Sequence, residues 1–418
     1  MKFVLNSIGT RGDVEPFITF AVFLKEQGHD VRCVFPEQFR FLAEDAEIPF
    51  SSLGSEFIDL IESDEGKLVM GGKGSLWKKL KAYIYLYNEG VRINKKLVQI
   101  QHDLIESEKP DRIIFNGKSS YPILWEMNNP GKSILVSPIP CLIHPVHNLA
   151  HVGFKGNYGK FINKLTYKLA NFGLIKNVGS TTKRYRIELN VSERMLRKNI
   201  LKQRLVYAIS PTVFPKRDYW PDNVEVMGYH ERVKTNHWEP SEELEQFLNV
   251  NPKCLFATFG SMLNDEPEQK TKIFMNVARK LNIPMVINTA AGGLVEPESY
   301  DRTKFCFVNQ VPYDWILPKV YGVIHHGGSG TTHITLKNGC ASLIIPHIID
   351  QFLWNDILSQ AGVGPKGMDV TKLSEKLLTD KMEQLYNNED YRVKSGEFAL
   401  KMKSESVLKT ELVNYFTS

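Results

Sequence analysis

Short apolar runs alternate with longer amphipathic stretches along most of this chain, a pattern typical of an α/β protein. Residues 3–8 predict a short buried strand, residues 9–15 a polar turn, and residues 16–27 a helix with a proline in its first turn. A second strand is predicted at residues 29–35, and the same order of elements returns at residues 255–288. The sequence therefore predicts two Rossmann-like units in tandem.

The length agrees with two domains, since 418 residues are well above the roughly 150 residues typical of one domain. Prolines punctuate residues 215–240 without clear periodicity, which indicates a linker. We place the boundary near residue 230, with one domain at residues 1–230, including the linker from about residue 215, and a second at residues 231–395. Apolar residues at helical spacing predict a last helix within residues 396–418, which we expect to return to the N-terminal domain.

Two stretches of the first half have the spacing of amphipathic helices. They are marked by Leu76, Leu80, Tyr83 and Tyr87, and by Ile162, Leu165, Leu169 and Phe172. A lysine stripe, formed by Lys160, Lys164 and Lys168, lies on another face of the second helix. The simpler interpretation is an apolar face packed on the core and a solvated lysine face. The alternative is an acceptor cleft or a contact with a membrane surface.

Composition places the chain among ordinary globular proteins, with 42% hydrophobic and 24% charged residues. The formal net charge of +5 is too small to indicate nucleic acid as a partner. Its distribution is uneven, because residues 155–204 contain 13 Lys and Arg against two acidic residues. This segment predicts a strongly basic surface and a peripheral contact with anionic membranes.

Cysteine usage and the N-terminus indicate the cytoplasm. The five cysteines are widely spaced and form no Cys-x-x-Cys, which argues against a disulfide framework and a thiolate zinc site. The chain opens with residues 1–8 in a strand pattern rather than a signal peptide, and no stretch is apolar enough to predict a membrane span. We expect a cytoplasmic protein whose membrane contact, at the inner face, is peripheral.

The strongest local signal is the glycine-rich stretch Val320 to Thr332. A strand enters a turn, and the next helix begins near residue 330, so free backbone N–H groups and the positive end of the helix dipole are predicted to bind an anion. Glycines allow a phosphate to approach the backbone closely. The alternative is a tight turn whose glycines serve packing alone.

Asp13 lies in a second polar turn, Gly9 to Asp13, at the carboxyl end of the first strand. Open α/β sheets bind their ligands at this edge, so Asp13 is a candidate base. An aspartate just before a helix is more often a cap, and the local pattern alone favours the cap.

Other motifs fail on inspection. The sequences ending in Gly117-Lys118-Ser119 and Gly131-Lys132-Ser133 lack the first glycine of a phosphate-binding P-loop. His144, His147 and His151 have helical spacing, but flanking prolines indicate a loop and no carboxylate joins them, which favours pocket lining or surface over a metal site. The chain has no Asp-x-Asp motif to hold a divalent ion. We therefore expect no metal and no cofactor.

Four segments together resemble the family 1 nucleotide-sugar glycosyltransferases, and most closely their bacterial and fungal branch with the sterol glucosyltransferases. They are Gly9 to Pro16, Val311 to Pro318, His325 to Thr332 and Pro346 to Trp354. The resemblance implies the GT-B fold, an α/β architecture of two Rossmann-like domains facing each other across a cleft. It further implies that the first domain binds the acceptor and the second binds the donor.

The donor signature of the plant relatives fits without a gap from Val308 to Gln351 when its histidine is aligned with His326. The match implies that the diphosphate is held by His326, through a charge-assisted contact, and by Gly328, Ser329, Gly330 and Thr331. Asp350 and Gln351 then bind the sugar, and Gln351 resembles the glucose users. The predicted donor site also includes Gly12, Ser261, Val308 and Val311.

Two positions differ from that signature. Val308 replaces the Trp that stacks on uracil, and Ile334 replaces the Glu that binds the ribose. The resemblance thus implies a nucleoside diphosphate hexose, with UDP-glucose first among the candidates.

Asp13 matches the catalytic position of the branch that this sequence resembles, which moves its interpretation from cap to general base. The implied reaction is a metal-independent, inverting transfer of a hexose to a hydroxyl of a hydrophobic acceptor: a sterol or terpenoid, a lipid or a phenolic compound. Candidate acceptor-binding residues are Trp77, Tyr83, Trp125, His144 and His147. Alternatives are a sugar-nucleotide epimerase on the same fold and a non-catalytic nucleotide-sugar-binding protein. A dehydrogenase is disfavoured, because Gly9-x-x-Gly12 is not Gly-x-Gly-x-x-Gly.

Overall fold

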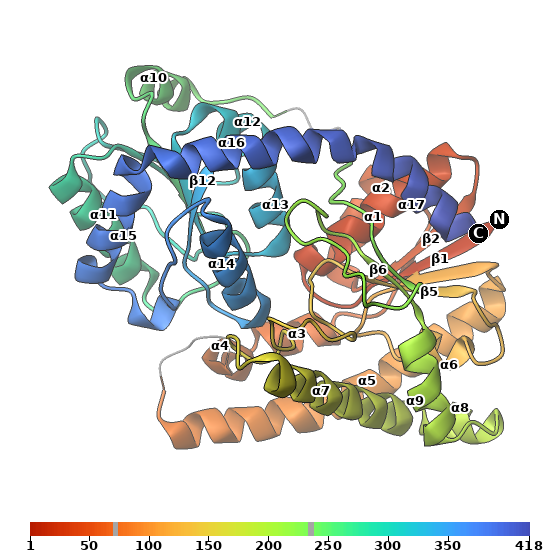
Figure 1. Ribbon diagram of the computed structural model, residues 1–418. Helices are drawn as coiled ribbons and strands as arrows, with labels where there is room; N and C mark the ends of the chain where they lie inside the picture. The colour runs from red at the N-terminus through yellow and green to blue at the C-terminus, as the bar shows by residue number, and fades with distance from the viewer. Residues whose placement is uncertain (70–73, 233–237) are drawn as a thin grey trace. The chain divides into compact units, whose positions relative to one another are not determined.

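The computed structural model describes residues 1–69, 74–232 and 238–418. The chain divides into two compact units (Figure 1). The first comprises Met1–Gly66, Leu76–Thr235 and Glu405–Ser418, and the second comprises Lys67–Ser75 and Asn236–Ser404. The sequence had indicated a boundary near residue 230 and a terminal segment from residue 396.

The first unit is built on a parallel sheet of seven strands in the order β3-β2-β1-β4-β5-β6-β7. The strands are β1 (Lys2–Asn6), β2 (Asp30–Phe35), β3 (Phe50–Ser52), β4 (Arg112–Phe115), β5 (Ser133–Ser137), β6 (Arg204–Tyr207) and β7 (Val224–Val226). In register, Val4 of β1 pairs with Arg32 of β2 on one side and with Ile113 of β4 on the other. Strands buried on both faces explain the continuous apolar runs in the sequence.

Helices cover both faces of this sheet. On one side lie α1 (Arg11–Glu26), α2 (Arg40–Asp45) and α17 (Leu408–Thr417), and on the other lie α5 (Leu76–Glu108), α6 (Tyr121–Trp125), α7 (Lys160–Thr181), α8 (Lys183–Glu188) and α9 (Glu193–Lys202) (Figure 1). Two short helices, α3 (Glu56–Glu62) and α4 (Asp64–Val69), precede α5. The core includes Leu412, Val413 and Phe416 of α17, and the ring of Phe416 lies 5.5 Å from that of Phe20.

The second unit is built on a parallel sheet of five strands in the order β10-β9-β8-β11-β12. Its strands are β8 (Leu255–Thr258), β9 (Met285–Asn288), β10 (Phe305–Val308), β11 (Gly322–His325) and β12 (Ala341–Ile344). Its helices are α10 (Glu242–Val250), α11 (Pro267–Leu281), α12 (Tyr313–Ile316), α13 (Ser329–Lys337), α14 (Ile349–Ala361), α15 (Glu375–Asn387) and α16 (Glu389–Lys403).

Each sheet has one point at which the strand order reverses. In the first sheet it lies between β1 and β4, because the chain first builds β2 and β3 on one side and then continues on the other. In the second sheet it lies between β8 and β11 for the same reason. Open α/β sheets bind ligands in the crevice outside the carboxyl ends of the strands at this point. These two edges therefore define where a site is expected in each unit.

The first helix begins earlier than the sequence predicted. It starts at Arg11, not at residue 16, so Asp13 is its third residue and Pro16 lies in its second turn. The prediction was wrong because proline was assigned to the first turn, where its missing N–H costs nothing. In the structure the start is set by the side chain of Asp13, whose Oδ2 accepts a hydrogen bond from the N–H of Thr10 at 2.9 Å.

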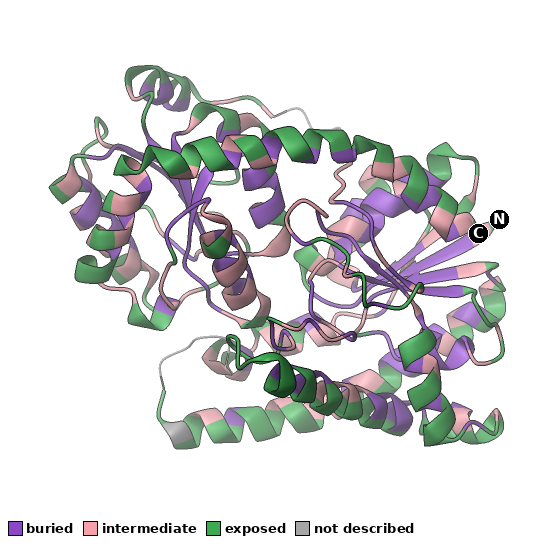
Figure 2. Cartoon of the chain, viewed as in Figure 1, coloured by how far each residue is buried: buried purple, intermediate pink, exposed green. Residues whose placement is uncertain are grey.

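The simpler interpretation of the two amphipathic stretches was also wrong. On α7, Ile162, Leu165, Leu169 and Phe172 are between 48% and 59% exposed, while Asn163, Thr166 and Tyr167 are buried. On α5, Leu80, Tyr83 and Tyr87 are exposed as well. Figure 2 shows exposed positions along both helices. Periodicity identified the apolar faces correctly, but these faces do not pack on the core.

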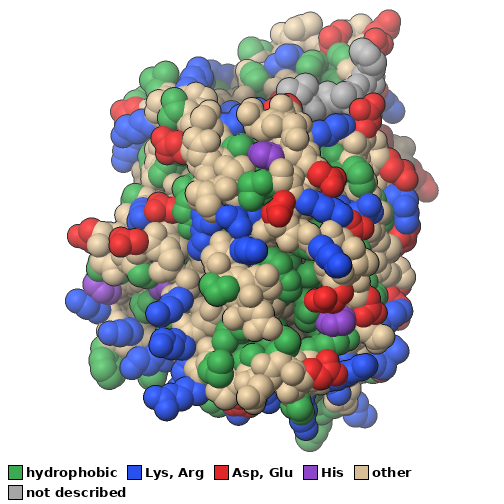
Figure 3. Space-filling model, turned by 90° about the vertical axis from the view of Figure 1, so that its right-hand side faces the viewer, with side chains coloured by type: hydrophobic (Ala, Val, Ile, Leu, Met, Phe, Trp, Pro, Cys, Tyr) green, Lys and Arg blue, Asp and Glu red, His purple; other side chains and the backbone are tan. Residues whose placement is uncertain are grey.

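Basic side chains gather at the lower left of the face shown in Figure 3, among exposed hydrophobic ones.

None of the helices in the described part of the chain combines the length and the hydropathy that crossing a membrane requires.

Candidate functional site

The glycine-rich turn of the second unit connects β11 to α13. Gly327 has φ +89°, and a Cβ at this position would lie 2.6 Å from Cγ2 of Ile344, so both the backbone conformation and the available space require glycine. Helix α13 begins at Ser329, one residue after Gly328. Its free N–H groups thus lie at the carboxyl edge of the sheet beside β11, where an anion can be bound.

His326 occupies the point where the strand order of the second sheet reverses. Gly260 follows β8, and a Cβ built on it would lie 2.8 Å from Cε1 of His326. A Cβ built on Gly328 would lie 2.4 Å from Nε2 of the same ring. The imidazole ring is therefore in close contact with the backbone of both turns. Glycine at 260 and 328 makes room for the ring.

Burial controls the charge of the histidines around this turn. It lowers the pKa of His326 well below its usual value, and nearby His325 and His347 lower it further. Burial also lowers the pKa of His325 to about 3 and that of His347 to about 4. His326 is therefore neutral near pH 7, so the predicted charge-assisted contact would take its charge from the phosphate alone. Its Nδ1 atom is buried without a hydrogen-bond partner among the described residues.

Gln351 is held in one orientation at the start of α14. Its Oε1 atom accepts hydrogen bonds from the N–H groups of His347 at 2.7 Å and Ile348 at 3.2 Å. These bonds occupy both lone pairs of the amide oxygen, which leaves the NH₂ end of the amide to donate to a sugar hydroxyl. Asp350, the residue before it, is half-buried. Ser329 and Thr331 are half-buried, whereas Gly330 is exposed.

A partly buried polar network holds the loop after β10. The N–H of Gln310, which has φ +64°, donates to Oδ1 of Asn288 at 3.2 Å. The Nδ2 group of Asn288 donates to Oγ1 of Thr258 at 3.3 Å, and that hydroxyl lies 2.9 Å from the hydroxyl of Tyr313. The network connects the carboxyl ends of β8 and β9 to the chain that follows β10.

Three predicted donor residues lie near this network in the chain. Val308 is half-buried at the end of β10, Val311 is buried, and Ser261 is exposed just after β8. Sequence reasoning missed the network itself, because its members are brought together by strand order rather than by local spacing.

Asp13 lies at the corresponding edge of the first sheet. Its Oδ2 atom accepts hydrogen bonds from the N–H of Thr10 at 2.9 Å, from the hydroxyl of Thr10 at 3.3 Å and from Nζ of Lys118 at 2.7 Å. No described residue donates a hydrogen bond to its other oxygen, Oδ1. Gly9 has φ +136°, and a Cβ there would lie 2.1 Å from Oδ2 of Asp13. The turn thus needs glycine at position 9, while Gly12, in the first turn of α1, is exposed.

Lys118 is a residue that sequence reasoning missed as part of this site, since it was considered only within a failed P-loop. It follows β4, and its N–H donates to Oδ1 of Asn116 at 3.3 Å. Asn116 in turn donates through Nδ2 to the carbonyl of Ile8 at 2.6 Å and to the hydroxyl of Ser7 at 3.0 Å. This buried asparagine connects the ends of β1 and β4, which places the ammonium group beside the carboxylate.

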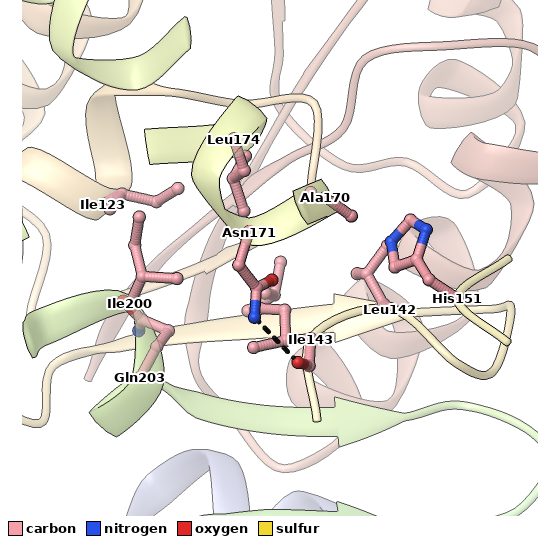
Figure 4. A pocket seen from close by; sticks show the side chains of 11 residues that line it. Ile123, Leu142, Ile143, His151, Ala170, Asn171, Leu174, Ile200 and Gln203 are labelled. Atoms are coloured by element: carbon pink, nitrogen blue, oxygen red, sulfur yellow. Dashed lines mark hydrogen bonds between the residues drawn. The ribbon is translucent and has the colours of Figure 1, made fainter. Parts of the chain in front are cut away.

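The first unit also contains an apolar cavity of about 210 Å³. Figure 4 shows His151 at one end of it and Ile200 with Gln203 at the other. It is lined by Gly117, Ile123, Leu135, Leu142, Ile143, His151, Ala170, Asn171, Leu174, Ile200 and Gln203. Burial lowers the pKa of His151 to about 4, so this ring is neutral. Gly117 precedes Lys118, and the cavity therefore reaches the loop that carries the partner of Asp13.

None of the five predicted acceptor residues belongs to the lining of this cavity. Trp77 and Tyr83 are exposed on α5, and Trp125 is buried in α6. His144 is buried, which lowers its pKa, and the ring of His147 stacks on that of Tyr219 at 3.9 Å. Within the described ranges, no group of three His, Cys, Asp or Glu side chains is arranged to hold a metal.

Family models match both ends of the chain. Residues 3–108 match the glycosyltransferase family 28 N-terminal domain, and residues 303–416 match the erythromycin biosynthesis protein CIII-like C-terminal domain. The chain belongs to the family 1 nucleotide-sugar glycosyltransferases.

The relatives of this chain include plant and fungal proteins. It is 26% identical to a sterol 3-beta-glucosyltransferase of Arabidopsis thaliana over 95% of its own length and 62% of that protein. It is 25% identical to the sterol 3-beta-glucosyltransferase of Saccharomyces cerevisiae over 98% of its own length and 34% of that protein. The chain thus spans less than two thirds of these curated relatives.

Solved structures show that the chain has the GT-B fold, as the sequence predicted. The kitacinnamycin glycotransferase superposes with a TM-score of 0.70 at 13% identity, covering 99% of this chain and 98% of that one. The calicheamicin glycosyltransferase superposes with a TM-score of 0.68 at 12% identity, covering 100% and 98%. A spinosyn rhamnosyltransferase solved with thymidine diphosphate superposes with a TM-score of 0.63 at 14% identity, covering 99% and 100%.

Proposed function

We propose that the protein is a glycosyltransferase that moves a hexose from a nucleotide sugar to a hydroxyl of a sterol-like acceptor. One observation carries this proposal: each sheet has a turn with polar chemistry where its strand order reverses. The first turn holds a carboxylate, Asp13, and the second holds a helix N-terminus with a buried imidazole, His326. An acid–base group and an anion site are the two parts that transfer from a nucleotide sugar requires. The names of the curated relatives support a sterol as the acceptor.

UDP-glucose is the donor that we propose. The orientation of Gln351, whose NH₂ end is left to donate, suits a sugar hydroxyl. The uracil ring of the donor is proposed to rest on the loop around Val308 and Val311, which the network of Asn288 and Gln310 holds in place. The spinosyn rhamnosyltransferase, which has this fold, was solved in complex with thymidine diphosphate. Its ligand supports a pyrimidine nucleotide as part of the donor.

We propose an inverting reaction with Asp13 as the general base. The acceptor oxygen attacks the anomeric carbon, its proton passes to Asp13, and the bond from that carbon to the diphosphate oxygen breaks. The Oδ1 oxygen is the natural recipient of the proton, because Oδ2 already accepts three hydrogen bonds. The N–H groups at the start of α13 and the ring of His326 stabilise the departing diphosphate. Every step in this scheme uses groups of the chain itself, and we propose that it needs no metal or other cofactor.

The apolar cavity beside Gly117 is the proposed acceptor site. Its lining is mostly aliphatic, and the NH₂ groups of its two amides are already engaged: Nδ2 of Asn171 donates to the carbonyl of Ile143 at 3.0 Å, and Nε2 of Gln203 donates to the carbonyl of Ser133 at 2.6 Å. Oε1 of Gln203 is buried without a partner among the described residues. Such a lining favours a rigid hydrocarbon over a sugar or a peptide. An acceptor of this kind resides in membranes. We propose that the protein is cytoplasmic and that the basic segment 155–204 gives it a peripheral contact with the inner face.

The test is to incubate the protein with UDP-glucose and a mixed panel of sterols, glycerolipids and phenolic compounds, with detection by mass. We expect a new glycoside whose mass exceeds that of one sterol by a hexose, and UDP release that depends on the acceptor. An epimerase would change the sugar without any acceptor, and a binding protein would retain UDP-glucose unchanged. Either result would overturn the proposal.

A further inference from the structure

Helix α7 has apolar side chains on two opposite sides. One side carries Ala170 and Leu174, which line the apolar cavity. The opposite side carries an exposed row that we term the α7 stripe: Phe161, Ile162, Leu165, Leu169 and Phe172. At 100° per residue these five side chains fall within one narrow arc of the helix. The most exposed of them, Phe161, is 83% exposed.

Helix α5 presents a similar row and packs beside α7 (Figure 1). The α5 stripe consists of Trp77, Leu80, Ile84 and Tyr87, at spacings of three and four residues, with Tyr83 next to it. Trp77 is 74% exposed and Tyr87 is 72% exposed. Exposure of large apolar side chains in such number is unusual on a soluble surface, whereas Trp and Tyr are the residues enriched where protein meets the lipid headgroups.

Lysines accompany the α7 stripe. Lys160, Lys164 and Lys168 are exposed along one flank of it. No carboxylate in the described ranges lies within salt-bridge distance of these three ammonium groups, whereas Lys176, near the other end of the helix, pairs with Glu193 at 2.9 Å. An apolar stripe with a lysine flank is the pattern of a helix that lies in the interface of an anionic membrane.

Charge distinguishes a lipid surface from a second copy of the chain. In a symmetric dimer formed through antiparallel α7 helices, the lysine flank of each copy would lie on the same side as that of its partner. Like charges at close range oppose such an association. An anionic lipid surface instead neutralises all three lysines while it covers the apolar stripe.

We propose that the α5 and α7 stripes form a docking face for anionic membranes. The apolar side chains enter the headgroup boundary and the lysines contact lipid phosphates. The inference refines the proposed membrane contact, because it assigns insertion to these two helices rather than to the basic segment as a whole. It rests on the proposed function, in which the protein takes its acceptor from a membrane. The acceptor cavity lies on the other side of α7, one helix thickness of about 10 Å from the face that meets the lipid.

The test is sedimentation with vesicles of phosphatidylcholine alone and of an equimolar mixture with phosphatidylserine, without donor or acceptor. The wild-type protein should bind the mixed vesicles more strongly. The double variant Phe161→Glu, Leu165→Glu should reduce this binding by about tenfold or more, because two apolar side chains no longer enter the interface. Leu400→Glu is the matched control: this side chain is 68% exposed on α16, in the second unit, and its variant should bind like the wild type.

The lysine contribution is measured with the triple variant Lys160→Gln, Lys164→Gln, Lys168→Gln. Its binding to mixed vesicles should fall by about a hundredfold or more, with little change on neutral vesicles. Equal binding by the wild type and both variants would overturn the proposal. So would a concentration-dependent dimer, seen by light scattering without vesicles, that the double variant abolishes. Melting curves of all variants confirm folding, since these side chains are exposed.

Failure of this inference is distinguishable from failure of the proposed function. Turnover of a detergent-dispersed acceptor should be unchanged in the double variant, because neither Phe161 nor Leu165 belongs to the cavity or to the acid–base pair. Loss of vesicle binding with intact turnover supports docking by this face. Intact vesicle binding in a protein that transfers no sugar would overturn the function alone.

Discussion

The ammonium of Lys118 lies 2.7 Å from Oδ2 of Asp13, although the two residues are 105 positions apart in the sequence. The contact exists because β1 and β4 are neighbours in the sheet, so that the loops following them meet at one edge. Asp13 therefore has two structural functions in addition to the proposed chemical one: the carboxylate accepts a hydrogen bond from the N–H of Thr10 and pairs with Lys118.

Replacing Asp13 separates these functions. Asp13→Asn retains an oxygen for the N–H of Thr10 but cannot accept a proton, so turnover should fall by about 10²-fold or more. Its stability should change by less than about 1 kcal/mol, because the lost ion pair is partly exposed. Asp13→Ala should also lose about 1 kcal/mol of helix stabilisation. Turnover, donor affinity and melting temperature, measured on both variants, distinguish a catalytic role of Asp13 from a purely structural one. An active Asn variant would refute the assignment of Asp13 as the base.

Lys118 should position the base rather than take part in the chemistry. We expect Lys118→Met to lower turnover by about tenfold, since one charge-assisted hydrogen bond no longer orients the carboxylate. Lys118→Arg should recover part of the loss. Lys132→Met, at an exposed lysine in a similar Gly-Lys-Ser sequence, is the matched control and should have wild-type turnover. If both Met variants are equally active, Lys118 has no positioning function.

His326→Ala should raise the Michaelis constant for the donor and lower turnover. A neutral ring can still donate one hydrogen bond to an ionised phosphate oxygen, worth about 1.5–3 kcal/mol, so we expect an effect of about ten- to a hundredfold. Gly328→Ala should have a comparable effect with the histidine still present, because its Cβ would lie 2.4 Å from Nε2 of the ring. Gly396→Ala, where a Cβ has no neighbour within 4 Å, is the matched glycine control. Donor kinetics like those of the wild type in a folded His326→Ala protein would remove the phosphate assignment.

Buried histidines should make the second unit sensitive to acid. Burial lowers the folded-state pKa of His333 and His347 to about 4 and that of His325 to about 3, and it also lowers that of His326. As pH falls below the unfolded value of about 6.5, the unfolded chain binds protons first, so stability present at neutral pH is lost toward the folded pKa.

Each such group should cost about 2 kcal/mol at a pH of about 5. Denaturant unfolding between neutral and mildly acidic pH measures the slope of the free energy of unfolding against pH. His333→Gln retains an N–H donor but does not titrate, and should reduce that slope. A free energy of unfolding that is constant over this range would contradict the prediction.

Activity should survive EDTA. The proposed stabilisation of the diphosphate relies on backbone N–H groups of α13 and on His326, and the sequence has no Asp-x-Asp motif. The measurement is turnover after chelation and dialysis, with and without added Mg²⁺ or Mn²⁺. Activity lost on chelation and restored by either ion would overturn the mechanism and redirect attention to His144, His147 and His151.

Sequence reasoning succeeded where the determining physics is local. The turn from Gly327 to Ser329 was predictable because a strand, glycines at special backbone angles and a helix start occur within a few residues. Lys118 and Asn288 were missed because strand order, not spacing, brings them to the site. For α7 the periodicity identified the apolar face through Leu165 and Leu169. Whether another element covers that face depends on tertiary packing, which periodicity does not report.

The place of α17 has a consequence for how the chain folds as it is synthesised. Leu412 and Phe416 belong to the core of the first unit, yet they follow the whole of the second unit in the sequence. When a ribosome has synthesised residues 1–232, these side chains have not yet been made. The apolar surface around Phe20 therefore stays exposed while the second unit is translated. The N-terminal unit should therefore complete its folding last, after the unit that is translated later. Removing the last dozen or so residues should make the N-terminal half prone to aggregate during synthesis.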